Sequence, residues 1–433
     1  MPGRNTQISG RSTLLAAACV ATGAFANPID TIRPDAPALA PFGPYAIGVR
    51  TEAITLPDSI DVLNIDGDDV PRYDRPLTLE IWYPAAIGTV AGGAYTATLR
   101  DGVTTATLTG RAARDAEPAA DGQFPLVLLS HGYPGNRFLM SHLGENLASK
   151  GYVAVAIDHT DSTYSDQAAF GATLLHRPTD QDRVLDHMAA LDGPLGAIID
   201  SDQTGIVGFS MGGYGALILG GAGVTEASTE FSWGTPNQLL AAHLAGSDSH
   251  EALVDTRVKA IIAIGPWGYN AGFWDMEGLA GLRVPTMLMA GSADDVAVYD
   301  AIRGIFDGAI DVERHLLTFA FANHNAAAPI PAPAESYEPS DGLDFVPFDH
   351  YADPVWDTAR MNNIAQHFAT AFFDLHLKGD ATRRDYLNLV PRSEDGIAAL
   401  NLTGVPGDDH TYWKGFPPRT AAGLRFETKA PGE

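Results

Sequence analysis

The chain has 433 residues, of which 45% are apolar, so it can build one large domain or two ordinary ones around a sizeable core. Acidic residues outnumber Lys plus Arg by 53 to 27, which gives a formal charge of −26. This charge would repel nucleic acids and anionic membrane surfaces, so the composition argues against both as partners.

The first 26 residues have the layout of a secretory signal peptide. Two arginines precede a short apolar stretch, and residues 24–26 read Ala-Phe-Ala, the A-x-A pattern of a cleavage site. The stretch is too short to span a bilayer. We expect cleavage after Ala26 and secretion to the periplasm or the medium, which also removes Cys19, the only cysteine. The alternative, lipid attachment at Cys19, requires a longer apolar run.

Residues 27–75 are rich in Pro and Asp and predict an N-terminal extension that wraps the domain. Residues 77–85 predict a strand, and 95–108 predict a hairpin that turns at Asp101-Gly102. No metal-ligand motif occurs, and we expect no metal site.

From residue 124 onward, buried strands and helices alternate along the chain. Strands that are apolar on both faces and are separated by helices indicate a mostly parallel sheet covered by helices, an α/β fold. We therefore expect one domain over 76–433. Two long insertions, near 224–256 and 325–357, leave the ends of elements where such a sheet places its ligand, and they are candidates for a cap.

Ser210 is the candidate nucleophile. It lies in the pattern G-x-S-x-G, between a predicted strand that ends in IVGF and a predicted helix that begins MGGYG. A nucleophile needs this corner, because the sharp turn lifts the hydroxyl clear of the sheet and the helix N-terminus favours negative charge nearby.

The serine hydroxyl becomes nucleophilic when a neutral imidazole accepts its proton and a carboxylate holds that imidazole. His324 ends the last predicted core strand and is the candidate base, with His350 as the runner-up. His315 begins the same strand, and we expect it at the surface. The acid follows the preceding strand, where Asp294 is favoured over Asp295. We expect Asp295 to cap the next helix.

Two backbone amides would stabilise an oxyanion at this corner. One is that of Met211, directly after the serine. The other lies in the loop HGYPGNR and is assigned to Tyr133, while His131 braces that loop. We expect Trp267 and Phe273 to line the substrate pocket, with Phe231 and Trp233 adding apolar contacts.

The segments SHGYPGNR, GYVAVAIDHTDST, GFSMGGYG, GSADD and NHN resemble the plasma-type platelet-activating-factor acetylhydrolases and predicted dienelactone hydrolases of the α/β-hydrolase superfamily. The resemblance covers about residues 75–380. It implies an eight-stranded sheet, a Ser/Asp/His triad and no cofactor. Characterised dienelactone hydrolases use a cysteine where this chain has Ser210.

These patterns together predict a secreted serine hydrolase that cleaves carboxylic esters of small or short-acyl substrates. The same elbow, with Tyr133 and Trp267, is also similar to bacterial cutinases, so a polyester hydrolase is one alternative and a phospholipid acetylhydrolase another. An acyltransferase would use the same acyl-enzyme. A non-catalytic binding protein of the same fold is the alternative from a different class. The oligomeric state is not predicted.

Overall fold

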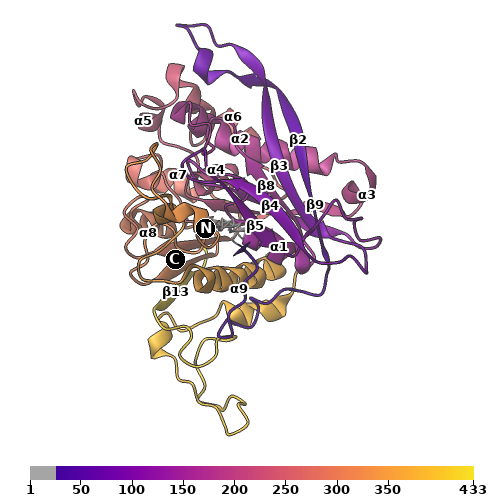
Figure 1. The fold of residues 1–433 in the computed structure, drawn as a ribbon. Coiled ribbons are helices and arrows are strands. Elements are labelled where there is room, and N and C mark those ends of the chain that lie inside the picture. Colours follow the sequence, from indigo (N-terminus) through magenta and orange to yellow (C-terminus); the bar gives the residue numbers. More distant parts are fainter. Residues whose placement is uncertain (1–25) are drawn as a thin grey trace, which may run out of the picture.

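A ten-stranded sheet runs through the molecule, whose computed structural model describes residues 26–433 (Figure 1). The predicted signal peptide, apart from Ala26, lies outside the described residues. From edge to edge the strands are β13 (Leu424–Lys429), β12 (Arg314–Phe319), β11 (Thr286–Gly291), β10 (Val258–Ile264), β9 (Ile199–Phe209), β7 (Phe124–Ser130), β8 (Val153–Asp158), β3 (Arg72–Pro84), β2 (Ile47–Ile60) and β6 (Ala113–Arg114).

The strands from β12 through β8 are parallel, which confirms the prediction for the centre of the sheet. The outer strands differ, because β13 pairs antiparallel with β12, and β3 and β2 continue the other side antiparallel. The resemblance implied eight strands, whereas the sheet has ten, and β2, β6 and β13 were not predicted from the sequence. In β13 only Leu424 and Phe426 are buried, since an edge strand needs an apolar residue only at alternate positions.

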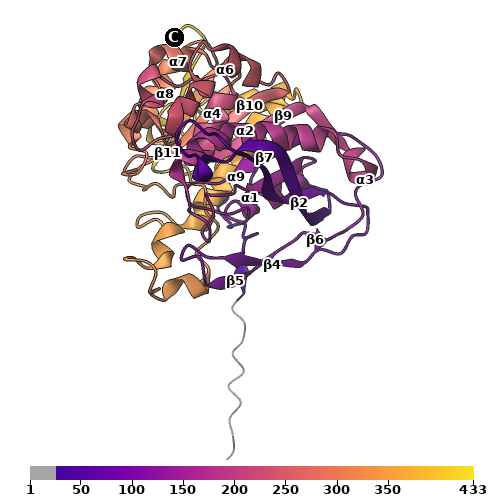
Figure 2. The same ribbon diagram turned by 90° about the horizontal axis from the view of Figure 1, so that it is seen from above.

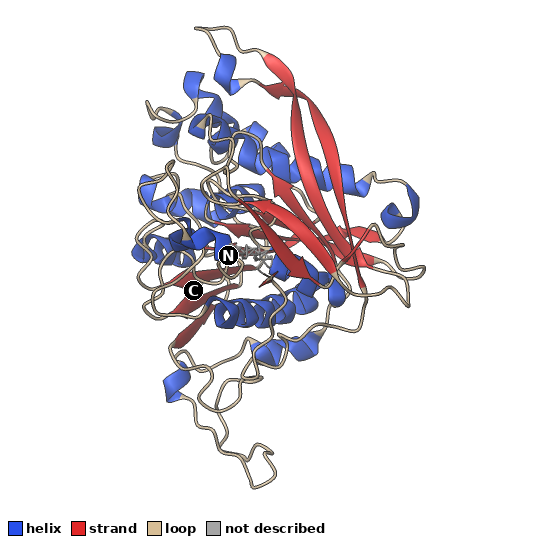
Figure 3. Ribbon diagram, in the orientation of Figure 1, coloured by secondary structure: helices blue, strands red, loops and turns tan. Residues whose placement is uncertain are grey.

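Helices cover both faces of the sheet (Figure 3). Because successive strand residues point to opposite faces, Leu126 and Leu128 contact one helical layer while Val127 and Leu129 contact the other. The first layer contains α2 (Phe170–Ala189), α4 (Met211–Leu219), α7 (Met276–Ala280) and α8 (Tyr299–Gly308). The second contains α1 (Ser141–Ser149) and α9 (Thr358–His376).

The last long helix, α9, packs its apolar stripe on the sheet. Its N-cap is Asp357, whose side chain accepts the amide of Arg360 at 2.8 Å, and Ile364, Phe368 and Phe372 are buried against the sheet. Leu375 is only partly buried. The chain then forms a long projecting segment before it returns as β13 (Figure 1).

The predicted hairpin is confirmed, since β4 (Gly93–Thr98) and β5 (Thr105–Gly110) pair antiparallel around Asp101-Gly102. Together with β1 (Asn27–Pro28) they form a separate three-stranded sheet. The second insertion packs beside this hairpin (Figure 2), where Asn27 Nδ2 donates to Glu335 Oε2 at 2.8 Å.

The segment 27–75 was predicted as an extension outside the domain, and this is wrong for its second half. Strand β2 and the start of β3 lie in the central sheet, where β2 pairs with β3 from Ile47–Pro84 to Ile60–Arg72. The structured domain therefore begins well before residue 76.

The two insertions contain only short helices. The first holds α5 (Glu226–Thr229), a 3₁₀ segment (Pro236–His243) and α6 (Asp248–Leu253), and the second holds 3₁₀ turns at Ala334–Tyr337 and Pro347–His350. The remaining α-helix of the described residues, α3 (Gly193–Gly196), precedes β9. In the described part of the chain, no helix has the length and apolarity needed to cross a membrane.

Candidate active site

Ser210 lies at the sharp turn between β9 and α4, with φ 52° and ψ −113°. A non-glycine residue with positive φ is strained, and the surroundings must hold it in place. Here the Ser210 amide donates to the carbonyl of Ile264 at 2.8 Å, and its carbonyl accepts from the amide of Tyr214 at 3.0 Å. The corner predicted from the sequence is therefore present.

The flanking glycines are required by close backbone contacts. A Cβ on Gly208 would lie 2.2 Å from the carbonyl oxygen of Gly212, and one on Gly212 would lie 1.9 Å from that of Ser130. Any side chain at either position would force the elbow open. The motif is thus explained by packing as well as by chemistry.

His324 and Asp294 are brought together at the ends of β12 and β11. His324 Nδ1 lies 2.8 Å from Asp294 Oδ2. The other oxygen, Oδ1, accepts the amides of Val296 at 2.9 Å and Ala297 at 2.8 Å. The prediction that Asp295 caps this segment is wrong, because Asp294 accepts both amides while the Asp295 side chain is exposed.

Ser210 and His324 face the same pocket, which has a volume of about 290 Å³. Within residues 26–433, neither the Ser210 hydroxyl nor His324 Nε2 forms a hydrogen bond, so both are free to meet a ligand. The other lining residues are Arg100, Gly132, Tyr133, Pro134, Phe209, Asp295, Val296, Asn323, Asn325, Phe345, Asp349 and His350.

The backbone amides of Tyr133 and Met211 flank Ser210. A Cβ on Gly132 would lie 3.3 Å from Ser210 Cβ, which places the loop of Tyr133 directly against the serine. Met211 is the first residue of α4. Across the described residues, neither amide donates a hydrogen bond to the chain. Two free donors beside a serine are what an oxyanion requires.

The predicted pocket residues Trp267 and Phe273 do not line this pocket. Phe273 is fully buried, with its ring centroid 5.5 Å from that of Tyr214, so the assignment of Phe273 as a substrate contact is wrong. Trp267 is partly buried and packs edge-on to Phe170, which in turn packs edge-on to Tyr133. Both residues belong to an aromatic cluster next to the pocket.

Arg100 and Phe345 also line the pocket and were not predicted from the sequence. The Arg100 guanidinium lies 5.3 Å from the centroid of the Phe345 ring, so the hairpin turn and the second insertion meet at the pocket. The turn at Asp101-Gly102 was recognised, but local signals do not say where in space a turn lies.

The two alternative histidines have other partners. His350 lines the pocket, but its Nε2 lies 2.9 Å from the hydroxyl of Tyr164, and burial together with the charge of Arg100 lowers its pKa. His315 was expected at the surface and is instead buried, because β13 and α9 cover that edge of the sheet. Burial lowers the pKa of His315 to about 4.

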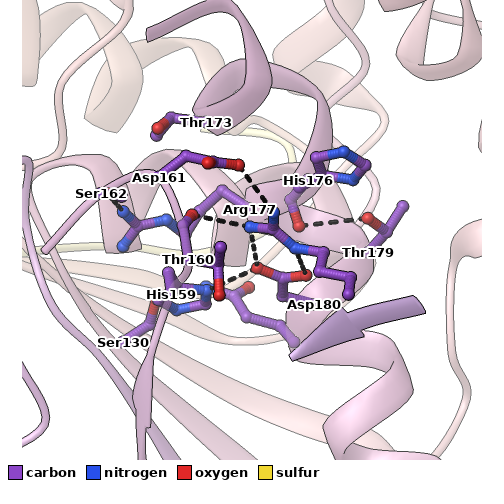
Figure 4. Close-up of polar contacts among 12 residues, drawn as sticks. Ser130, His159, Thr160, Asp161, Ser162, Thr173, His176, Arg177, Thr179 and Asp180 are labelled. Atoms are coloured by element: carbon purple, nitrogen blue, oxygen red, sulfur yellow. Dashed lines mark hydrogen bonds and ion pairs between the residues drawn. The ribbon is translucent and has the colours of Figure 1, made fainter. Parts of the chain in front are cut away.

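A second Ser-His-Asp arrangement lies deeper in the molecule (Figure 4). Ser130 Oγ is 2.9 Å from His159 Nε2, and His159 Nδ1 is 2.9 Å from Asp180 Oδ2. All three side chains are at most 1% exposed, and none lines the pocket. The geometry is that of a triad, but a substrate cannot reach this serine. No local sequence motif predicts this arrangement, because its members come from β7, the end of β8, and α2.

Among the residues that the structure describes, no group of three His, Cys, Asp or Glu side chains is arranged to hold a metal ion.

Comparison with solved structures decides the fold. A ferulic acid esterase from Streptomyces cinnamoneus aligns with a TM-score of 0.52 over 77% of this chain and 91% of that one, at 21% identity. The protein has the α/β-hydrolase fold. The resemblance recognised in the sequence is confirmed at this level.

Other comparisons match parts of this chain. The family model described as "Platelet-activating factor acetylhydrolase, isoform II" matches residues 83–184. Cutinase 2 of Thermobifida cellulosilytica is 26% identical over 42% of this chain and 52% of its own length. Bis(hydroxyethyl) terephthalate hydrolase of Streptomyces coelicolor is 34% identical over 23% of this chain and 29% of its own length. The chain spans about half or less of the length of the curated relatives it matches.

Proposed function

We propose that the protein is a serine hydrolase that cleaves carboxylic esters. One observation carries the proposal: Ser210 stands at a strained strand-to-helix corner and faces a pocket with His324, which Asp294 already holds. The names of the relatives, cutinase and a terephthalate ester hydrolase among them, support ester cleavage. The proposed catalytic residues are Ser210, His324 and Asp294.

In this mechanism Ser210 Oγ attacks the ester carbonyl while His324 Nε2 takes its proton. The carbonyl oxygen becomes an oxyanion that the amides of Tyr133 and Met211 stabilise. Collapse of the tetrahedral intermediate breaks the C–O bond, and His324 gives its proton to the departing alkoxide. Water then attacks the acyl-enzyme by the same steps, which releases the acid and restores Ser210.

We propose small or short-acyl esters as substrates, because the second insertion stands across the pocket. Phe345, Asp349 and His350 all come from it, and Arg100 contacts Phe345 from the opposite side. Trp267 would contact only a substrate that is long enough to extend past Tyr133 to the aromatic cluster. The cutinase relatives favour a polyester as the second candidate substrate, since a polymer chain could bind along the half-exposed Trp233 at the outer end of that cluster.

We further propose export, with residues 1–26 as the signal peptide. The N-terminal sequence of protein recovered outside the cytoplasm would then begin at Asn27, whereas an N-terminus at Met1 or a lipidated Cys19 would contradict this.

The test is hydrolysis of nitrophenyl butyrate by the wild type and by Ser210→Ala. The change leaves a small residue that the corner accepts, so we expect kcat to fall by at least ~10³-fold with little loss of stability. A variant that kept half the wild-type rate would remove Ser210 from the mechanism. Wild-type protein that bound the ester without cleaving it would favour the non-catalytic alternative.

A further inference from the structure

Arg177 is a buried cation with no acidic partner. It lies on α2 and is 1% exposed, and within residues 26–433 no carboxylate lies within ion-pair distance of it. The nearby Asp180 is occupied by Arg75, at 2.9 and 3.1 Å, and by His159. Burying a charge without a counter-ion is costly in free energy. If this residue only formed structural hydrogen bonds, a neutral donor would form them at a lower cost.

The Arg177 guanidinium instead donates to uncharged oxygens, two of which are carbonyls of the loop beside Ser210. Nη1 donates to the carbonyl of His131, and Nη2 donates to the Ser162 hydroxyl and to the carbonyl of Gly132 at 3.4 Å. The Gly132 carbonyl and the Tyr133 N–H belong to one planar peptide unit, and in a trans peptide they point in opposite directions. Fixing this carbonyl therefore fixes the direction of the Tyr133 N–H.

His131 binds the same carbonyl and can do so in only one tautomer. Its Nε2 accepts the amide of His159 at 3.3 Å, so the ring proton must be on Nδ1, which donates to the Gly132 carbonyl at 2.7 Å. His159 is itself held between Ser130 and Asp180 (Figure 4). The buried Ser-His-Asp arrangement thus has a role as the support of this loop.

Helix α2 also reaches the other side of the elbow. Gln181, one turn after Arg177, donates from Nε2 to the Gly212 carbonyl at 3.0 Å. A Cβ on Gly215 would lie 2.6 Å from Arg177 Cγ and 2.9 Å from Gln181 Nε2, so α4 packs directly on both side chains. One helix therefore ties together the loop of Tyr133 and the first turn after Ser210.

We propose that Arg177 is a positioning residue of the oxyanion site: with His131 it fixes the Gly132–Tyr133 peptide and places a positive charge behind it. The peptide transmits this charge to the developing oxyanion, since a cation at the carbonyl end makes the N–H a stronger donor. The inference rests on the proposed function, because it requires an oxyanion at Ser210.

The test compares Arg177→Met and Arg177→Lys with His176→Phe as the matched control. His176 is the preceding residue on α2 and is also mostly buried, but its Nε2 contacts the carbonyl of Ile60 at 2.9 Å, away from the elbow. For each variant, kcat and KM for nitrophenyl butyrate, the inhibition constant of a butyl trifluoromethyl ketone and the melting temperature are measured.

We expect Arg177→Met to lower kcat ~10²-fold, to leave KM within about threefold and to weaken the ketone by a similar factor, because the ketone adduct presents the oxyanion. Arg177→Lys keeps the charge, so kcat should fall only about tenfold. If the Met variant fails to fold, the Lys variant provides the test. His176→Phe should lower the melting temperature while kcat and the inhibition constant stay unchanged.

Full kcat and full ketone affinity in a folded Arg177 variant would overturn the proposal, as would equal losses in the His176 variant. Both results are distinct from failure of the proposed function, which would show as a fully active Ser210→Ala.

Discussion

Asp294 uses its two carboxylate oxygens for two different tasks. Oδ2 contacts His324, and Oδ1 accepts two backbone amides of the following turn. Those amides fix the carboxylate, so the imidazole is held by a group that cannot rotate away. Its neighbour Asp295 points to solvent at the pocket rim.

A pair of substitutions tests which of these two adjacent acids holds His324. We expect Asp294→Asn to lower kcat by ~10²- to 10⁴-fold, because the amide favours the wrong tautomer of His324, and to lower stability by about 1 kcal/mol through weaker hydrogen bonds to the amides of Val296 and Ala297. Asp295→Asn should leave both quantities near the wild type. Steady-state kinetics and thermal melts provide the comparison, and the reverse ranking would assign the acid to Asp295.

The site residues that could be predicted from the sequence are those that lie near the ends of predicted strands. Ser210, His324 and Asp294 each directly follow a buried strand or stand within a few residues of one, and the carboxyl ends of parallel strands meet at one edge. Arg100 and Phe345 could not be found in this way, because the first lies in a turn and the second in an insertion. The sequence of such segments does not predict where they lie relative to the sheet. Phe273 was misassigned because an aromatic near a strand end packs the core as readily as it lines a pocket.

At the scale of elements, the second insertion is the part that faces the pocket. Arg100 contacts Phe345 across the opening, whereas the neighbouring Phe348 packs on Tyr337, at 4.7 Å between ring centroids, inside the insertion. The first insertion contributes the aromatic cluster of Phe231 and Trp233 rather than the pocket wall.

Acyl-chain length should therefore have a sharp optimum. Each methylene that fits contributes about 0.8 kcal/mol to transition-state binding, so kcat/KM should rise over the first few carbons and then drop where the chain meets the wall. Phe345→Ala should move the optimum to longer nitrophenyl esters, and Phe348→Ala should not. Faster turnover of micellar palmitate or of a polyester film than of soluble butyrate would contradict the wall.

The alternating strands and helices after residue 124 were predictable because strands buried on both faces are apolar throughout. Helix α2 runs from Phe170 to Ala189 and continues through Pro178, because burial of its apolar face outweighs one lost hydrogen bond. Strands β2 and β13 were not predicted, because a strand toward the edge of a sheet needs apolar residues only at alternate positions.

At the scale of the whole molecule, histidines buried in the neutral form link stability to pH. Burial lowers the pKa of several histidines far below 6.5, to about 3 for His142, His159 and His367 and to about 4 for His243 and His315. The unfolded chain takes up protons at these sites below pH about 6.5, whereas the folded chain does not. Stability is therefore lost as pH falls from about 6.5 toward 3.

His142 offers the cleanest test of this linkage, because it is buried on α1 and neither ring nitrogen has a partner from residues 26–433. Denaturant unfolding at pH 7 and pH 4 should show that His142→Leu loses about 3 kcal/mol less than the wild type over this interval. Equal losses in the two proteins would mean that His142 is protonated in the folded state.

We propose Ser210, and not the better hydrogen-bonded Ser130, as the nucleophile. Ser130 already contacts His159 but is fully buried, whereas Ser210 opens to the pocket beside His324. The direct measurement is to treat the folded wild type with a fluorophosphonate and to locate the adduct by mass spectrometry of its peptides. We predict stoichiometric labelling at Ser210 and none at Ser130 in the wild type, and no labelling in Ser210→Ala. An adduct on Ser130, or labelling that persists in the Ser210 variant, would contradict the account.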